Sequence, residues 1–149
     1  LKLVGARAQN WLRQEKSYRA FGNELGRDAT PAEADLPRFI DQCKEFNGKT
    51  AMEKIGIRAQ CVTVLINGPE DADPWGREAL LLDGKKVGRL TSGGYSVHFG
   101  KQIGLGYVPQ ALAVTGQKLK VRILGKLWDA EVVEDSPYDP TNSAIRVDG

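Results

Sequence analysis

The segment Leu80–Pro109, LLLDGKKVGRLTSGGYSVHFGKQIGLGYVP, decides the fold of this chain. It opens with three leucines, turns at Asp83-Gly84 and continues into a second apolar run. An Asp-Gly pair between two strand-like runs predicts a β-hairpin, because both turn positions of a type I′ turn need a positive φ. Glycines this frequent inside strands mark bulges, corners or close backbone approach. The pattern therefore predicts a small barrel or a curled antiparallel sheet.

Two further regions extend the β pattern on either side of this segment. Residues 61–66 have the continuous apolar character of a strand that is buried on both faces. Residues 118–123 alternate strictly, with apolar side chains inward and cations outward, and Gly125-Lys126 turns the chain into a partner strand at 127–133. Acidic residues of that partner are expected to face the cations across the ladder, each pair contributing roughly 0.2–1 kcal/mol. We expect residues 58–134 to form one compact β unit.

The first third of the chain is predicted to form an α+β segment that packs against that β unit. A helix is expected over Leu3–Trp11, followed by turns, and Thr30-Pro31 indicates a loop or a helix start. Residues 38–40 are a short strand candidate, and a helix capped by Asn47 is expected to stop at Gly56. Basic residues dominate the opening and favour either a solvated face or a cationic wall for an anionic ligand: Lys2, Arg7, Arg13, Lys16, Arg19 and Arg27.

Composition limits the classes of function. A net charge of +2 does not predict a nucleic-acid-binding surface, and no apolar run approaches the ~20 residues of a membrane span. Cys43 and Cys61 fit neither a disulfide framework nor a metal site, so we expect reduced, buried thiols and a cytoplasmic location. The chain begins at Leu1 rather than at methionine, and we expect it to be the C-terminal piece of a longer protein.

The sequence offers no catalytic residue and no metal ligand set. His98 is the single histidine, which excludes a catalytic triad and a multi-histidine metal site and favours a structural role. Gly48-Lys49-Thr50 resembles the end of a phosphate-binding loop, but Cys43 stands where that motif requires its first glycine. We therefore reject a phosphate-binding loop.

Four collinear segments resemble the glycine-cleavage T-protein (aminomethyltransferase) family. Gly5–Arg19 is similar to that family's GARxxxxLRLEKGYR, and Asp28–Leu36 to its D-x-T-P-x-E-A-G-L. Phe46–Met52 is similar to F-I-G-R/K-x-A-L. Gly88–Ser96, together with Gly106–Pro109, is similar to the signature G-x-x-T-S-G-x-x-S…G-Y-V-P. Each segment alone is moderately specific, and their shared order along the chain carries the resemblance.

The resemblance is strongest to the C-terminal folate-binding part of dimethylglycine and sarcosine dehydrogenases. It implies the end of an α+β folate-binding domain over residues 1–56, followed by a small antiparallel β-barrel over residues 57–149. In such enzymes an upstream FAD domain oxidises an N-methyl amine, and the folate domain captures the one-carbon unit on tetrahydrofolate. The family's catalytic aspartate and pterin-binding glutamate would lie upstream of Leu1, so the isolated piece is expected to be inactive.

The resemblance also implies where folate is contacted. Arg7 matches an arginine that contacts folate in relatives, and a guanidinium suits carboxylate or carbonyl oxygens. Arg38 stands where the family has a pocket aromatic, and we expect it to pair with a polyglutamate tail; Ser143 replaces a tyrosine. Ser17 and Asp35 replace glycines. The alternatives are a stand-alone T-protein, a folate-dependent demethylase, and a non-catalytic barrel used for subunit docking.

Overall fold

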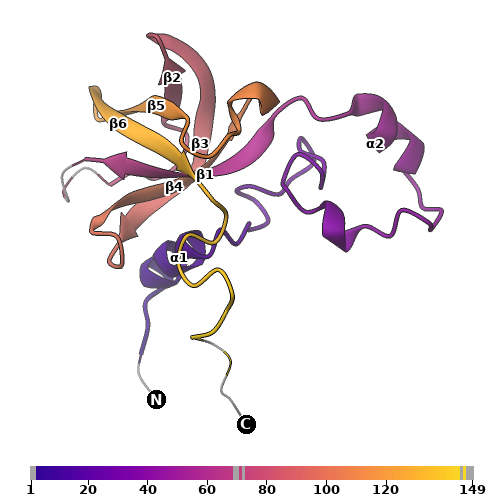
Figure 1. Ribbon diagram of the computed structural model, residues 1–149, viewed down its shortest axis with the longest axis horizontal. Coiled ribbons are helices and arrows are strands. Elements are labelled where there is room, and N and C mark those ends of the chain that lie inside the picture. The colour runs from indigo at the N-terminus through magenta and orange to yellow at the C-terminus, as the bar shows by residue number, and fades with distance from the viewer. Residues whose placement is uncertain (1–2, 69–70, 72, 145, 147–149) are drawn as a thin grey trace.

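The computed structural model describes residues 3–68, 71, 73–144 and 146, which fold around a closed antiparallel barrel (Figure 1). The strands follow the order β1-β4-β3-β2-β5-β6 around the barrel. They are β1 Gln60–Asn67, β2 Ala79–Leu82, β3 Lys85–Ser96, β4 Lys101–Val108, β5 Lys118–Ile123 and β6 Lys126–Val133. The helices are α1 Ala6–Glu15 and α2 Lys49–Ile55, with 3-10 turns at Pro37–Phe39 and Gln110–Leu112.

The hairpin predicted at Asp83-Gly84 is confirmed. Both residues have positive φ, 50° and 76°, and they join β2 to β3 as a two-residue turn. The alternation predicted for β5 is also confirmed, since Leu119, Val121 and Ile123 point into the barrel core. The predicted charge pairs form across β5 and β6, at 2.6 Å each: Lys118–Glu131 and Lys120–Asp129.

Strand β1 is buried on both faces, as predicted. Val62, Val64 and Ile66 belong to the barrel core. On the opposite face Cys61 and Thr63 are covered by the chain that precedes the barrel, and the Thr63 hydroxyl lies 2.6 Å from that of Ser17. The N-terminal third therefore packs directly against the outside of the barrel.

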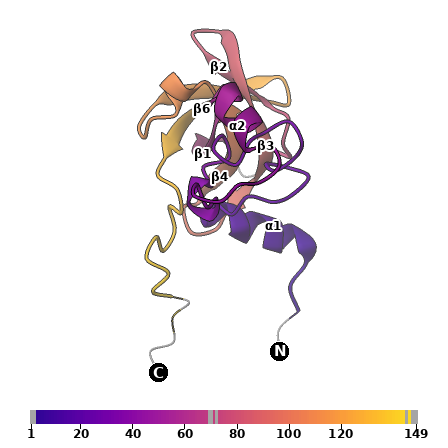
Figure 2. The ribbon, with the colours of Figure 1, turned by 90° about the vertical axis from the view of Figure 1, so that its right-hand side faces the viewer.

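The parts of the chain outside the barrel lie at one end and along one side of it. Helix α1 lies across one end, next to β3 and β4, and the segment that follows β6 runs past that same end in both views (Figures 1 and 2). The segment between Leu36 and β1 extends sideways, and α2 is the part of it that lies far from the strands (Figure 1). No residue of α2 is buried in the described chain.

Several local predictions for the N-terminal third were wrong. The first helix begins at Ala6 and extends to Glu15, with Gly5 at its N-cap rather than in its interior. Residues 38–40 do not form a strand, because Pro37 begins a 3-10 turn that includes Arg38. Helix α2 is preceded by Gly48 with a left-handed φ of 97° and has no side-chain cap, so Asn47 does not cap it; Gly56, at φ 64°, does end it.

The interpretation of the basic residues also needs correction. Arg13, Lys16 and Arg19 do not form a solvated face, because their side chains are largely buried in ion pairs. Lys2 lies outside the described residues. Cys61 is buried as expected, and burial raises the pKa of its thiol to about 12, whereas Cys43 is exposed. His98 is exposed and packs edge-on against the rings of Phe99 and Tyr138, and its structural role stays a prediction.

One buried carboxylate, Glu24, joins α1 to the barrel. Its side chain is 0% exposed and accepts hydrogen bonds from the Thr91 and Ser92 hydroxyls at 2.8 and 2.5 Å. Arg13 of α1 donates to the same carboxylate at 2.9 Å and to the Ser92 hydroxyl at 2.6 Å. The register between β3 and β4 shifts between Leu90 and Ser92, so Thr91 is an extra residue. This bulge breaks the strand alternation, and the two consecutive hydroxyls both reach Glu24.

The glycine pair in β3 makes room for two neighbours of the barrel. A Cβ on Gly94 would lie 2.1 Å from Trp11 Cδ1, and a Cβ on Gly93 would lie 2.6 Å from the Pro74 side chain. The prediction that these glycines allow close approach is confirmed. Trp11 of α1 and the loop before β2 therefore both lie directly against the backbone of β3.

A second polar cluster fixes the segment that follows β6. The guanidinium of Arg19, 5% exposed, pairs with Asp135 at 2.6 Å and lies 3.8 Å from Asp35. Burial raises the pKa of Asp35, and its hydrogen bond and Coulombic repulsion with Asp135 raise it further. Ser17 and Asp35 both adopt positive φ, at 53° and 59°. Both side chains belong to this cluster. The Ser136 amide donates a hydrogen bond to the Ser17 hydroxyl at 2.8 Å, and the Asp35 carboxylate faces Arg19.

The contact between Gly94 and Trp11 predicts a steric penalty. We expect Gly94→Ala to lower the free energy of unfolding by about 1–3 kcal/mol, because the new methyl group and the indole cannot occupy the same space. Urea-induced unfolding measures the loss. Gly5→Ala is the matched control, because its Cβ would meet nothing within 4 Å and its φ is −75°. Equal stability of the two variants would contradict the close packing of α1 on β3.

Replacement of the Glu24 carboxylate is predicted to lower stability more than the Gly94 substitution does. Glu24→Gln is expected to lower the free energy of unfolding by about 3–5 kcal/mol, because it leaves the buried guanidinium of Arg13 without a counter-charge. Glu131→Gln removes one partner of the exposed pair with Lys118, for which a change below about 1 kcal/mol is expected. Similar losses for the two variants, compared by urea-induced unfolding, would show that Glu24 is not the main link between α1 and the barrel.

The Asp35 carboxyl predicts a pH dependence. Because its pKa is higher in the folded state than in the unfolded state, its contribution to stability is full below the unfolded pKa of about 3.9. That contribution is lost as the pH rises through the folded pKa. The stability of Asp35→Asn relative to the natural protein should therefore increase from pH 3.5 to pH 7. Asp83→Asn, also at a positive φ but in an exposed hairpin turn, is the control; an equal pH dependence would contradict the assignment.

Candidate functional site

Arg7 lies in the first turn of α1 between two indole rings. Its guanidinium carbon is 5.3 Å from the ring centre of Trp11 and 5.0 Å from that of Trp75, which is largely exposed. The guanidinium also pairs with Asp73 and remains half exposed. Such stacking orients the planar guanidinium and leaves part of its donor set free for a ligand.

Arg7 borders a cavity of about 270 Å³ whose other walls are mostly apolar. The lining residues come from α1, the loop before β2 and strand β3: Arg7, Asn10, Trp11, Pro74, Trp75 and Gly93. The absence of a side chain at Gly93 brings Pro74 against the strand. A flat ring that carries an anionic group fits these walls, since it can stack on an indole while the anion faces Arg7.

Arg38, the second residue expected to contact folate, lines a different cavity. Its guanidinium carbon stacks 4.9 Å from the ring centre of Phe39, in the 3-10 turn that replaced the predicted strand. That cavity, of about 360 Å³, is also lined by Arg19, Asp35 and Asp135. The structure therefore does not bring Arg7 and Arg38 to one cavity. Ser143 hydrogen-bonds to Asp139 at 2.8 Å and lines neither of these two cavities.

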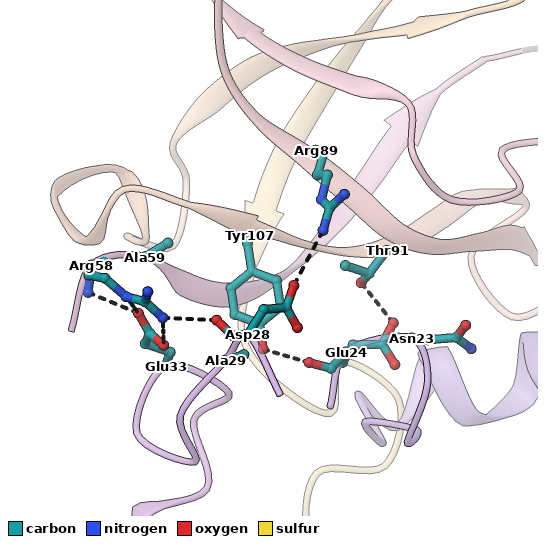
Figure 3. A pocket seen from close by; sticks show the side chains of 10 residues that line it. All are labelled: Asn23, Glu24, Asp28, Ala29, Glu33, Arg58, Ala59, Arg89, Thr91 and Tyr107. Atoms are coloured by element: carbon teal, nitrogen blue, oxygen red, sulfur yellow. Dashed lines mark hydrogen bonds and ion pairs between the residues drawn. The ribbon is translucent and has the colours of Figure 1, made fainter. Parts of the chain in front are cut away.

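A third cavity, of about 260 Å³, lies where residues 23–33 approach the outside of β3 and β4 (Figure 3). Its walls carry charges of both signs: Asn23, Glu24, Asp28, Ala29, Glu33, Arg58, Ala59, Arg89, Thr91 and Tyr107. Tyr107 donates a hydrogen bond to the Glu24 carbonyl at 2.8 Å, and burial raises the pKa of its phenol. The Thr-Ser-Gly signature has a structural role here, because the hydroxyls of Thr91 and Ser92 donate hydrogen bonds to the Glu24 carboxylate.

Sequence reasoning missed Trp75, Asp73 and Glu24. Trp75 and Asp73 lie in an irregular loop with no periodicity to mark them, and they reach Arg7 only through the tertiary fold. Glu24 lies between turn residues, and only its pairing with Arg13 and the bulge at Thr91 reveals its role. The signal available in the sequence was the Thr-Ser-Gly motif itself, whose hydroxyls need a buried partner.

The described residues do not form a site for FAD. A dinucleotide site needs a glycine-rich turn between a strand and a helix, whereas Gly104 and Gly106 lie inside strand β4. In the part of the chain that the structure describes, no group of three or more His, Cys, Asp or Glu side chains is arranged to hold a metal ion. No helix there is long and apolar enough to cross a membrane.

Comparison with known proteins gives consistent results over most of the chain. The chain is 36% identical over 152 residues to the mitochondrial dimethylglycine dehydrogenase of Rattus norvegicus, covering 97% of this chain and 18% of that protein. It is 36% identical over 138 residues to the aminomethyltransferase of Moorella thermoacetica, covering 88% of this chain and 36% of that protein. The chain thus spans a minor part of the length of either relative.

A solved structure shares the fold. The glycine cleavage system aminomethyltransferase T from Bartonella henselae superposes with a TM-score of 0.80 over 89% of this chain and 38% of its own, at 24% identity. The family model of the glycine cleavage T-protein C-terminal barrel domain matches residues 60–139, from the start of β1 to beyond the end of β6. Because this match covers more than half of the chain, the chain belongs to the glycine cleavage T-protein family, and residues 60–139 are the part that matches its C-terminal barrel domain.

Proposed function

We propose that this chain is the C-terminal part of an enzyme that passes a one-carbon unit from an N-methyl amine to tetrahydrofolate. Residues 1–56 would complete a folate-binding domain, and residues 57–149 would form the barrel that closes it. FAD would bind in a domain upstream in the same polypeptide, as the similarity to dimethylglycine dehydrogenase suggests. The similarity to dimethylglycine dehydrogenase over nearly the whole chain supports this choice among the family's enzymes.

The observation that carries the proposal is the placement of Arg7 beside an aromatic cavity. Tetrahydrofolate carries a p-aminobenzoyl ring next to a glutamyl carboxylate. The indoles of Trp11 and Trp75 offer surfaces for the ring, and the half-exposed guanidinium offers donors for the carboxylate. A guanidinium has five N–H donors, so Arg7 can keep Asp73 while it binds a ligand.

The chain's own contribution to the reaction is binding and orientation. Arg7 would hold the acidic side of folate, and Arg38, exposed and on a separate cavity, would meet only a glutamyl tail that extends beyond the Arg7 cavity. Neither residue exchanges a proton in the proposed role, and we assign no catalytic residue here. Formation of methylene-tetrahydrofolate would depend on holding the reactants close together in a water-poor site that the upstream domains complete.

The location of the protein stays a prediction. We expected a cytoplasmic enzyme from cysteine usage, whereas the rat relative is named as mitochondrial. A reducing compartment of either kind is compatible with the free thiols of Cys43 and Cys61.

Tetrahydrofolate binding to the full-length protein tests the proposal. Isothermal titration calorimetry of Arg7→Ala should show a loss of about 1.5–3 kcal/mol in binding free energy, the worth of a hydrogen bond to a charged group. Arg122→Ala removes an exposed arginine from β5 and should bind as the natural protein does. Arg38→Ala should weaken binding of polyglutamylated tetrahydrofolate more than that of the monoglutamate.

The other outcomes separate the parts of the proposal. If Arg7→Ala binds folate as tightly as the natural protein does, the proposed enzyme class is retained but the assignment of Arg7 to the folate site is contradicted. Absence of folate binding in the natural protein would contradict the proposed function and favour a barrel used for subunit docking.

A further inference from the structure

The mixed-charge cavity of Figure 3 has walls that are already fixed by internal bonds. Arg58 donates to Glu33 through Nε at 2.8 Å and Nη2 at 2.9 Å, and its backbone amide donates to the same carboxylate at 3.1 Å. Hydrogen bonds from Arg58 lower the pKa of Glu33 to about 2, so this carboxylate stays charged at neutral pH. Glu24 is likewise fully engaged with Arg13, Thr91 and Ser92. These two carboxylates are structural and have no capacity left for a ligand.

Two opposite charges on the same cavity remain loosely held. Arg89 of β3 and Asp28 lie 3.8 Å apart, Nη2 to Oδ2, which is an ion pair without a hydrogen bond. Their side chains are 56% and 80% exposed, and neither forms a side-chain hydrogen bond with the described residues. The third nitrogen of Arg58, Nη1, also has no partner among them. An exposed pair at this separation contributes little to stability, so a ligand can open it at low cost.

The remaining surface around this pair has a defined shape. Half-buried Tyr107 offers a ring face, Ala59 leaves space, and the exposed Asn23 offers an amide at the rim. Figure 3 shows Arg89 reaching down from β3 toward Asp28, with Arg58 entering from the other side. Arg58 lies beside Glu33 on the opposite side of this cavity, where its Nη2 donates to the Asp28 carbonyl at 2.8 Å. A volume of about 260 Å³ suits a molecule of a few heavy atoms rather than a nucleotide.

We propose that this cavity binds a small zwitterionic amino acid, with its carboxylate on Arg89 and its ammonium group on Asp28. A zwitterion replaces both halves of the Arg89–Asp28 pair and leaves no charge uncompensated. A simple anion would contact only Arg89 and a simple cation only Asp28, so each would make one of the two charge contacts that a zwitterion makes. The site is separate from the cavity at Arg7, and the proposal does not depend on folate binding.

Ligand-observed NMR on the full-length protein tests this site, because saturation-transfer difference spectra detect weak binding to large proteins. Glycine is the zwitterionic probe, and acetate and methylammonium each carry one of its charges. We expect a saturable glycine signal and at least tenfold weaker binding of the two half-probes. Arg89→Gln and Asp28→Asn should each weaken glycine binding at least tenfold. Both positions are exposed, and thermal unfolding of each variant checks that the fold is kept.

Matched variants and alternative outcomes keep the test decisive. Lys118→Gln removes an exposed cation of a similar ion pair on β5 and should leave glycine binding unchanged. The charge exchange Asp28→Arg with Arg89→Asp should restore part of the glycine affinity lost in either single charge reversal. Acetate binding as tight as that of glycine would show an anion site and overturn the proposal. Glycine binding that is unaffected by Arg89→Gln would place the amino acid elsewhere on the protein and overturn it as well.

Discussion

The Glu24 carboxylate is the contact through which the N-terminal third and the barrel hold one another. It is fully buried, and in one place it accepts hydrogen bonds from a helix arginine, two strand hydroxyls and the Ala20 amide. A buried charge of this kind is tolerated only when every oxygen is satisfied. Because the partners come from separate segments, each segment must be in place for the others to be stable. The placement of α1, and with it the placement of Arg7, follows from this requirement.

The bulge and the glycine pair in β3 adapt the barrel to its N-terminal neighbour. A regular strand would present Thr91 and Ser92 to opposite faces, and the extra residue at Thr91 turns both hydroxyls toward Glu24. Two residues further on, Gly93 and Gly94 allow Pro74 and Trp11 to touch the strand backbone. One short motif therefore supplies both the polar bond and the close packing. Residues that resemble a signature of the family's barrel serve here to assemble the domain.

The sequence predicted the barrel better than it predicted the parts around it. The Asp83-Gly84 hairpin and the alternating strand β5 could be predicted from neighbouring residues alone. An Asp-Gly pair specifies the turn, and apolar residues at every second position specify the strand. The buried state of Arg13 and Arg19 could not be predicted, because their carboxylate partners Glu24 and Asp135 are 11 and 116 residues away. In the sequence, a basic residue that will be buried in an ion pair cannot be distinguished from one that will be solvated, because its partner is not a neighbour along the chain.

The candidate site was predicted only in part, and for a related reason. Arg7 was found through the resemblance of a local motif, which holds within a single helix. Trp75 and Asp73 come from a loop 66 residues or more along the chain, and no local pattern connects them to the helix. Arg38 was misplaced onto a strand because Pro37 was taken as the end of a turn rather than as the start of one.

Closure of the barrel limits how this part of the chain can meet other proteins. Strand β1 pairs with both β4 and β6, so the ring has no open edge at which a further strand could add by backbone hydrogen bonds. This protects the barrel from edge-to-edge aggregation, a hazard of flat sheets with exposed β-strands. It also means that the strands of the ring would contact other proteins mainly through side chains, on faces that can diverge in sequence without disturbing the ring. A scaffold of this kind can keep one architecture while its surroundings change from one enzyme to another.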